Sequence, residues 1–393
     1  MPNLPTRLLL NLGHALDHMF LLIFATAVTS IAKDFGLARW EDLMPYSAVA
    51  FFFFGVGSLP AGRLGDLWGR RPMMIVFFVG IGLASLAVGA TTSPWQLALA
   101  LVVLGSAASI YHPVGIPMLV QGEKRPGWAI GVNGLAGNLG LAAAAAVTGL
   151  LIQQWGWRMA FVVPGILSIL LGVLFAFVAP RDAVAPAKKK ATTAHREGIS
   201  MARLLFLMTI AATTGSMLFN FSTSSNYEML AGRLGQVSQD PAQIGYFLAG
   251  AYVLASFTQL LVGQLLDKVA LKSLYLAVIG VQLLALVLGV VAQGWAFYAA
   301  QILFMAAIFG AVPFTDAMVV RYVDDAMRSR VSGMRLAVAL GASSLAVWLI
   351  GPIVKAAGFG TLLGVMAVTA GLTLMVVSLL PRTEPAAAGA AQA

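Results

Sequence analysis

Long apolar runs separated by short polar segments dominate this chain of 393 residues. Each run is close to the roughly 20 residues that an α-helix needs to cross the hydrocarbon core of a membrane. The segments between them are rich in the Gly, Pro, Ser and Thr residues that are typical of turns. We therefore predict an all-α membrane protein with twelve transmembrane helices, at residues 8–32, 43–64, 72–91, 95–120, 127–151, 158–179, 202–229, 243–266, 272–292, 295–320, 330–354 and 358–380.

The composition agrees with this prediction. Hydrophobic residues make up 60% of the chain and charged residues only 10%, which is too few charges to cover the surface of a soluble protein. The first apolar run is too long for a signal peptide, so we interpret it as a transmembrane helix. The chain has no cysteine, which excludes disulfides and thiolate metal sites.

The basic residues predict the orientation. An even number of spans places both termini on one side of the membrane, and cytoplasmic loops are enriched in Lys and Arg. The net charge of +9 is therefore explained by topology, and we expect no nucleic-acid partner. With cytoplasmic termini in a bacterial inner membrane, all but five of the 24 Lys and Arg residues lie inside, the exceptions being Lys33, Arg39, Arg158, Arg233 and Lys355.

The chain is predicted to contain two repeated halves. We expect an N-terminal six-helix bundle at 1–180, a cytoplasmic linker at 181–201, a C-terminal six-helix bundle at 202–380 and a disordered tail at 381–393. Matching residues recur at offsets of 200 to 202, which is typical of two parallel repeats. The matches are the GRLGDL of 62–67 with the GQLLDK of 263–268, Pro113 with Pro313, Met118 with Met318, and Asn133 with Arg335.

A charged, glycine-rich segment, GRLGDLWGRR at residues 62–71, joins the second and third predicted spans. It resembles the loop motif between helices 2 and 3 of the major facilitator superfamily of transporters, G-x-L-x-D-x-x-G-R-[RK]. The resemblance implies two pseudo-symmetric six-helix bundles that transport a solute. It also implies a gating role for Gly62, Asp66, Gly69, Arg70, Arg71 and the corresponding Asp267.

Ionisable residues inside the spans are candidates for function, because they are costly in a membrane. His14, Asp17 and His18 have the spacing that places all three on one helical face. We expect this face to line a central cavity and to couple transport to protons. Asp316 is a further proton-coupling candidate, because it is expected at a depth similar to that of Arg335, as an ion pair that substrate or a proton would break.

The first half also resembles the fosmidomycin-resistance-type efflux branch of the superfamily. The resemblance is carried by His14 with Asp17, by His112-Pro113 and by Asn138 with Gly140. Val114 departs from the branch, which has an acidic residue after His-Pro. The branch resemblance implies export of a drug or metabolite in exchange for protons.

Polar residues elsewhere in the spans are the predicted substrate contacts. Pro113 is expected to interrupt the fourth helix. The polar run from Asn220 to Glu228 predicts that the seventh helix either bends or unwinds there, or ends near Phe221. The predicted substrate-binding residues are Tyr111, His112, Asn133, Asn138, Asn220, Asn226, Tyr227 and Arg335.

Together these patterns predict a secondary active transporter that works by alternating access. No phosphate-binding loop, Ser-His-Asp arrangement or zinc-protease motif occurs in the sequence, so we expect no enzyme and no cofactor. The expected partners are a small organic substrate, protons and membrane lipids, and we expect a monomer.

Three alternatives stay open. The first is proton-coupled uptake of a polar metabolite or organic anion, which would use the same residues in the opposite direction. The second is a metal or metal-chelate carrier, with His14, Asp17, His18 and His112 as ligands. The third is a sensor without transport activity or a lipid flippase. The preferred interpretation assigns no metal ligand.

Overall fold

The computed structural model describes residues 2–119, 121, 126–181, 201–235, 237–266, 268–322 and 325–381. Every regular element among these residues is helical. In chain order the elements are α1 (Leu4–Asp34), the 3-10 turn η1 (Trp40–Asp42), α2 (Met44–Trp68), α3 (Arg70–Gly89), α4 (Pro94–Ala108), the π-helix η2 (Tyr111–Gly115), α5 (Ile116–Leu119), α6 (Pro126–Trp155), α7 (Trp157–Val178), α8 (Met201–Arg233), α9 (Pro241–Leu266), α10 (Leu271–Val291), α11 (Gly294–Tyr322) and α12 (Asp325–Ser378).

The helices follow the predicted spans to within a few residues. Eleven helices of the described residues are long and apolar enough to cross a membrane. The last of these belongs to α12, whose 54 residues are broken at Gly358, where φ is 76°. Glycine adopts this left-handed conformation without the steric penalty that a side chain would bring. The break falls at the predicted boundary between the last two spans.

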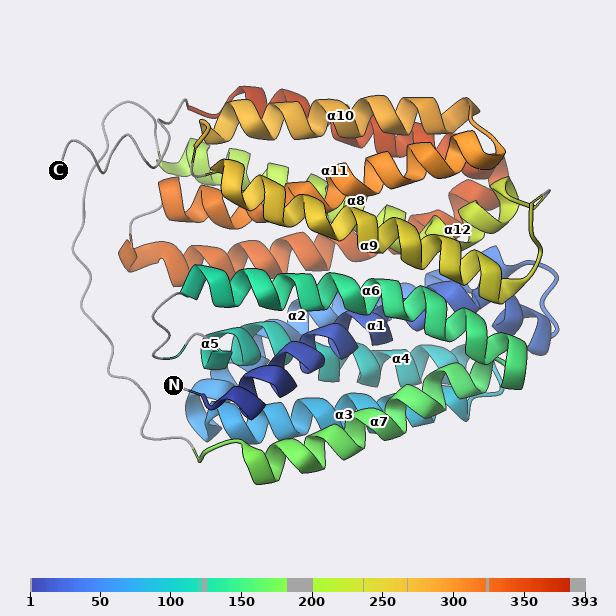
Figure 1. Cartoon of the computed structure of the whole chain (residues 1–393), viewed down its shortest axis with the longest axis horizontal. Helices are drawn as coiled ribbons and strands as arrows, with labels where there is room; N and C mark the ends of the chain where they lie inside the picture. The colour runs from blue at the N-terminus through green and yellow to red at the C-terminus, as the bar shows by residue number, and fades with distance from the viewer. Residues whose placement is uncertain are drawn as a thin grey trace.

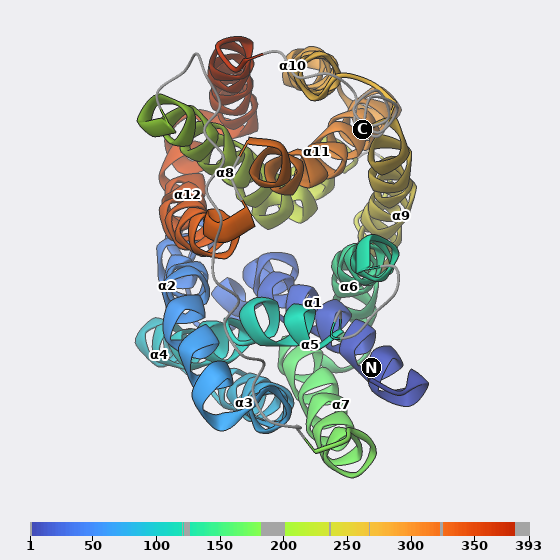
Figure 2. The same ribbon diagram turned by 90° about the vertical axis from the view of Figure 1, so that its left-hand side faces the viewer.

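The helices lie roughly alongside one another, and the beginning of α1 and the end of α12 lie at the same end of the molecule, here called the terminal end (Figure 1). Viewed from that end, α1 to α7 group on one side and α8 to α12 on the other (Figure 2). We call these groups the N-terminal and C-terminal halves. They meet mainly where α2 packs against α12 and where α6 packs against α9. We call the opposite end of the molecule, where α1 ends and α9 begins, the far face.

Glycines bring the helices together closely. A Cβ atom added at Gly82 of α3 would lie 2.6 Å from the carbonyl oxygen of Gly165 in α7. At the α6–α9 contact, a Cβ at Gly245 would lie 2.5 Å from the oxygen of Ala145, and one at Gly149 would lie 2.7 Å from that of Pro241. Small residues allow this backbone approach, which is typical of helix packing in membranes.

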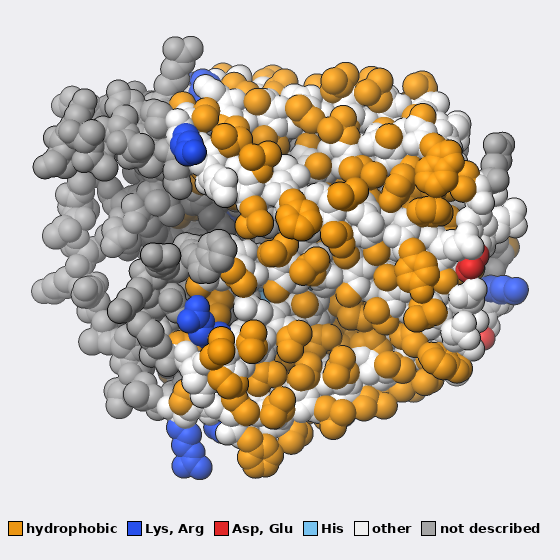
Figure 3. Space-filling model, viewed as in Figure 1, with side chains coloured by type: hydrophobic (Ala, Val, Ile, Leu, Met, Phe, Trp, Pro, Cys, Tyr) orange, Lys and Arg blue, Asp and Glu red, His pale blue; other side chains and the backbone are white. Residues whose placement is uncertain are grey.

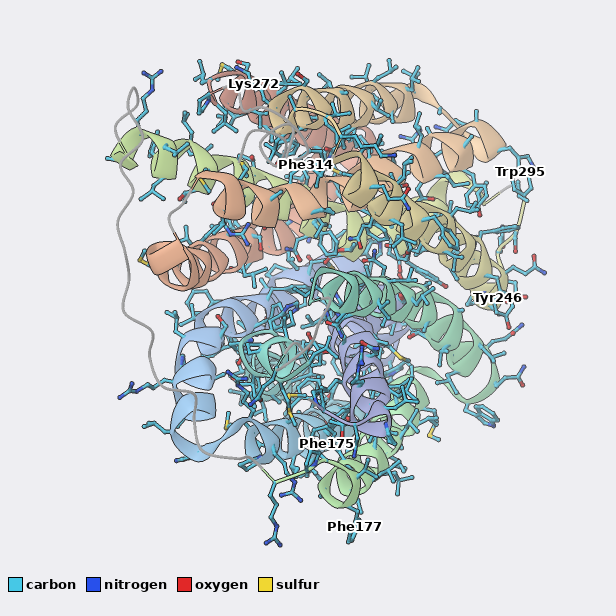
Figure 4. All side chains as sticks on the ribbon, turned by 60° about the vertical axis from the view of Figure 1, so that its left-hand side comes forward. Phe175, Phe177, Tyr246, Lys272, Trp295 and Phe314 are labelled. Atoms are coloured by element: carbon cyan, nitrogen blue, oxygen red, sulfur yellow. The ribbon has the colours of Figure 1, made fainter. Side chains whose placement is uncertain are left out.

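The surface carries a broad apolar band. Hydrophobic side chains cover the middle of the visible face, whereas most of the visible Lys and Arg side chains lie at the terminal end, and the visible acidic side chains lie at the far face together with Lys or Arg (Figure 3). Phe177 is 85% exposed near the terminal end, and Phe175 is buried. Trp295 and Tyr246 lie at the end opposite Lys272 (Figure 4). An exposed apolar band with polar ends is the surface of an integral, multi-pass membrane protein.

The prediction that the seventh span unwinds or ends early was wrong. Helix α8 neither unwinds in its polar run nor ends near Phe221, but continues to Arg233. The hydroxyl groups of Ser222, Thr223 and Ser225 each donate to the carbonyl oxygen four residues earlier, at 2.6 to 2.9 Å. Because these three hydroxyl groups are satisfied within the helix, they do not require it to break.

The predicted interruption of the fourth span is confirmed. Helix α4 ends at Ala108, and the chain forms the π-helix η2 around Pro113 before α5 begins. Proline has no N–H group to donate to the helical ladder, so the turn widens at this point. The widened turn positions Tyr111 and His112 against α1, as described below.

Candidate functional site

Three of the four histidines in the sequence meet in the N-terminal half. His14 and His18 lie one turn apart on α1, and His112 comes from the π-helix η2. The ring centre of His14 lies 4.8 Å from that of His18 and 5.1 Å from that of His112. One ligand nitrogen from each ring lies within 4.8 Å of the others. The predicted face of α1 is thus completed by a residue more than ninety positions away in the sequence.

Asp17 lies beside this cluster and has no exposed surface. Its Oδ2 atom lies 3.7 Å from His112 Nε2, which is within ion-pairing distance. Neither carboxylate oxygen has a hydrogen-bond partner among the described residues. A buried carboxylate without hydrogen bonds is energetically costly, and such groups are a mark of functional sites.

The orientation of His14 is fixed by α6. Its Nδ1 atom lies 2.6 Å from the carbonyl oxygen of Asn133, and because a carbonyl can only accept, Nδ1–H is the donor. The lone pair of Nε2 therefore faces the cluster, where His18 Nε2 lies 3.1 Å away. Gly137, one turn further along α6, makes room for the ring, since a Cβ there would lie 2.8 Å from His14 Cε1.

Tyr111 and Asn133 hold His14 in place by stacking and hydrogen bonding. The Tyr111 ring stacks on His14, with ring centres 4.8 Å apart and planes 7° from parallel. The Tyr111 hydroxyl donates to the oxygen of Leu10 at 2.7 Å and accepts from Asn133 Nδ2 at 2.7 Å. Asn133 Nδ2 also donates to Asn11 Oδ1 at 2.9 Å. The structure therefore brings Tyr111, His112 and Asn133 together with the predicted face of His14, Asp17 and His18.

Asn138 lies nearby on α6 but takes no part in this network. Its side chain is buried, and its Nδ2 atom has no hydrogen-bond partner among the described residues. It is an unused donor in the same half as the cluster.

The candidate residues of the C-terminal half do not form one cluster. Asn220 donates to Ser343 Oγ of α12 at 2.9 Å, whereas Asn226 donates to the Tyr252 hydroxyl of α9 at 3.1 Å. Tyr227 donates to the oxygen of Pro241 at 3.3 Å, at the beginning of α9. Asn220 and Asn226 thus face different neighbours, and the contact of Tyr227 lies at the far face.

Arg335 of α12 is buried and lines a cavity of about 200 Å³ between α8 and α12. The other lining residues are largely apolar: Leu205, Met208, Thr209, Met334 and Val338. The side chain of Asp316, its predicted partner, lies outside the described residues. The predicted Asp316–Arg335 pair therefore stays a prediction.

The segment at 62–71 ties helices together within the N-terminal half. Gly69 has a φ of 98°, which makes the turn from α2 to α3. Arg70 donates to the oxygen of Pro117 at 3.0 Å, and Arg71 donates to the oxygen of Ala179 at 2.9 Å.

The gating role of this segment stays a prediction. A Cβ at Gly62 would lie 3.3 Å from Pro113, which places α2 directly against the π-helix. The side chain of Asp66 and the whole of Asp267 lie outside the described residues.

Contacts across the far face were missing from the sequence-based predictions. The Thr29 hydroxyl of α1 donates to Glu228 Oε1 of α8 at 2.8 Å, and Lys355 of α12 forms an ion pair with Asp42 of η1. Both contacts join the two halves. The carboxylate of Glu228, at the end of a predicted span, was a signal of a functional contact in the sequence. Its partner Thr29 could not be predicted, because it is 199 positions away.

A cavity of about 670 Å³ lies at the far face, lined by residues 36–41 with Thr29, Ala32 and Lys33. Beside it Arg39 donates to Glu41 Oε1 at 2.6 Å, and this hydrogen bond raises the pKa of the guanidinium. Arg39 therefore stays a cation here at every physiological pH.

Comparison with known proteins identifies the family. The family model described as Major Facilitator Superfamily matches residues 10–235, which is more than half of the chain.

Two curated relatives illustrate the similarity. Puromycin resistance protein pur8 of Streptomyces alboniger is 31% identical over 159 residues, a match that covers 40% of this chain but only 31% of that protein. Multidrug resistance protein MdtG of Proteus mirabilis is 20% identical over 310 residues, covering 76% of each.

The fold has a solved counterpart. The crystal structure of a bacterial homolog of the human lysosomal transporter Spinster, in an inward-facing and occupied conformation, superposes with a TM-score of 0.74. The sequences are 16% identical, and the match covers 95% of each chain. With helices of this arrangement and a family match over more than half its length, the chain belongs to the major facilitator superfamily.

Proposed function

We propose that this protein is a proton-coupled secondary transporter that exports a small organic molecule by alternating access. The family and its fold are those of membrane transporters for small molecules, which are not enzymes. In this proposal residues 1–180 and 202–380 form two six-helix bundles, with twelve spans in all, that rock about a central site. The break at Gly358 supports the count, because it divides α12 into two helices.

The buried cluster on α1 is the observation that carries the proposal. Asp17 has no exposed surface and no hydrogen-bond partner in the described part of the chain, and its Oδ2 atom lies 3.7 Å from His112 Nε2. A carboxylate next to imidazoles offers groups that can each accept a proton. We propose that Asp17, with His14 and His18, carries the coupling proton, and that Asp316 takes part from the C-terminal half.

The substrate site is proposed to lie between the halves. Tyr111, His112, Asn133 and Asn138 would contact the substrate from one half. From the C-terminal half, the substrate would be contacted by Arg335, which lines its cavity, and by Asn220 and Asn226 of α8. Polar groups in an otherwise apolar cavity fix the orientation of a ligand, and an arginine selects for an anionic group.

The far face is proposed to be the outer side. Lys and Arg at the terminal end agree with cytoplasmic termini (Figure 3). This assignment is supported by the contacts Thr29–Glu228 and Asp42–Lys355, which join the two halves at the far face, and by the solved counterpart, which is described as inward-facing. We propose that these contacts form the outer gate, and that residues 62–71 act in the inner one.

Export is the preferred direction. The resemblance to the fosmidomycin-resistance-type branch favours it, as do two relatives named for resistance to puromycin and to multiple drugs. Uptake would use the same residues, so the direction of the pH gradient that drives flux decides between the two.

The test is flux in proteoliposomes with an imposed pH gradient. The probes are radiolabelled puromycin and ethidium, compared between wild type, Asp17→Asn and Asp34→Asn. Asp34 is the matched control, because it is a carboxylate on the same helix that is paired with Arg158 at the exposed far face. We expect gradient-driven flux to be lost in Asp17→Asn and kept in Asp34→Asn. Equal flux in the two variants would remove Asp17 from the mechanism.

A further inference from the structure

We propose that His14, His18, His112 and Asp17 form a binding site for one divalent transition metal ion of the zinc, cobalt or nickel class. The proposal concerns the three residues to which the proposed function assigns protons, His14, Asp17 and His18, together with His112, which it assigns to the substrate; a bound metal would occupy these atoms in place of protons. It rests on the geometry of the cluster and does not depend on which organic molecule is transported.

The spacing of the nitrogen atoms fits a common metal ion. Zinc–nitrogen bonds are about 2.0–2.1 Å long, so two ligands of a tetrahedral ion lie about 3.3 Å apart. His14 Nε2 and His18 Nε2 lie 3.1 Å apart, and the third histidine keeps the set within 4.8 Å. His18 and His112 are both partly exposed, so a small side-chain rotation would close the set.

The surroundings of His14 are those of a metal ligand. A ligating histidine almost always donates its second ring N–H to a carbonyl or carboxylate, which fixes the tautomer. His14 Nδ1 makes this bond to Asn133, and its Nε2 lone pair is left facing the cluster. Tyr111 and Gly137 hold the ring from its two faces.

Asp17 supplies the second, independent observation. Both of its oxygens are buried and accept no hydrogen bond from any residue that the structure describes, and Oδ2 lies 3.7 Å from His112 Nε2. A divalent cation among the three imidazoles would give this carboxylate a partner and would offset the cost of burying it. Imidazole suits zinc, nickel and copper, whereas magnesium and calcium prefer sites made only of oxygen, so we expect selectivity for transition metals.

The test is equilibrium binding to the purified full-length chain, prepared with an affinity tag that contains no histidine. Calorimetry with ZnCl₂ should give one site per chain, and MgCl₂ should give no heat at the same concentrations. Co²⁺ bound at a site of imidazoles and a carboxylate should give visible absorption bands. Removing one ligand in His18→Ala or His112→Ala should weaken zinc binding by at least about 100-fold.

Two further variants separate ligation from damage to the fold. His195→Ala changes the one histidine that is not in the cluster, and it should bind zinc as wild type does. Gly137→Ala keeps all four ligands but pushes a methyl group to 2.8 Å from His14 Cε1, so we expect a loss of about 10- to 100-fold. Thermal unfolding without metal verifies that each variant is folded.

The proposal is overturned if zinc does not bind, if His18→Ala and His112→Ala bind as wild type does, or if magnesium binds equally well. These outcomes are distinct from failure of the proposed function. If metal does not bind while Asp17→Asn loses gradient-driven flux, the metal site is excluded and proton coupling stands. If zinc binds and Asp17→Asn keeps its gradient-driven flux, the metal site stands and the role of Asp17 in proton coupling is excluded.

Discussion

The contact between α6 and α9 gives the sharpest test of how the far face closes. Gly245 of α9 packs against the backbone of Ala145, and an added Cβ would lie 2.5 Å from that carbonyl oxygen. An ordinary contact begins at about 3.4 Å, so Gly245→Ala requires the two helices to separate by about 0.9 Å. Overpacking of this kind costs about 1–3 kcal/mol.

This strain acts on one conformation only. In alternating access the halves separate at the far face when the outer gate opens, so the added methyl group destabilises the closed state and not the open one. A difference of 1–3 kcal/mol shifts the population toward the open state by about 5- to 150-fold. We therefore predict that Gly245→Ala opens the far face.

Cysteine labelling measures this shift directly, because the natural chain contains no cysteine. A single cysteine at Thr26, which is 5% exposed and lies one turn before Thr29, reports the opening. A membrane-impermeant maleimide applied at the far face should react faster in Gly245→Ala by up to the same factor. Gly280→Ala in α10 is the matched control, since an added Cβ there has no neighbour within 4 Å among the residues that the structure describes. Equal labelling rates in Gly245→Ala and Gly280→Ala would refute the reasoning.

Three further outcomes follow from described contacts. Thr29→Ala removes a hydrogen bond between the halves worth about 1 kcal/mol, so far-face labelling should rise about fivefold; an unchanged rate would show that the bond does not hold the gate. Tyr111→Phe removes two buried hydrogen bonds and should lower stability by about 1–3 kcal/mol in thermal unfolding, whereas Tyr246→Phe, about half exposed, should change it by less than about 0.5 kcal/mol. On α3, an added Cβ would lie 2.6 Å from its nearest atom at Gly82 but 3.5 Å at Gly80. Gly82→Ala should therefore lower stability by about 1–3 kcal/mol, and Gly80→Ala should not. Similar unfolding temperatures for the two variants would contradict this packing.

Local sequence was sufficient for much of the fold. Apolar runs gave the helices within a few residues, because burial in lipid leaves the backbone little choice but to form its own hydrogen bonds. Pro113 marked the interruption of the fourth span, and His14, Asp17 and His18 were placed on one face by helical spacing alone. The same local reasoning failed for α8, where Ser222 and its neighbours bond within the helix instead of breaking it.

Tertiary structure decided everything that depends on partners distant in the sequence. Helical periodicity placed His14 and His18 together, but only the fold of the N-terminal half brings His112 to them and fixes the His14 tautomer through Asn133. It also decided that Thr29 reaches Glu228 and that Gly245 lies against Ala145. The physical reason is that a helix determines which residues share a face, whereas the close approach of backbones between helices determines which faces meet.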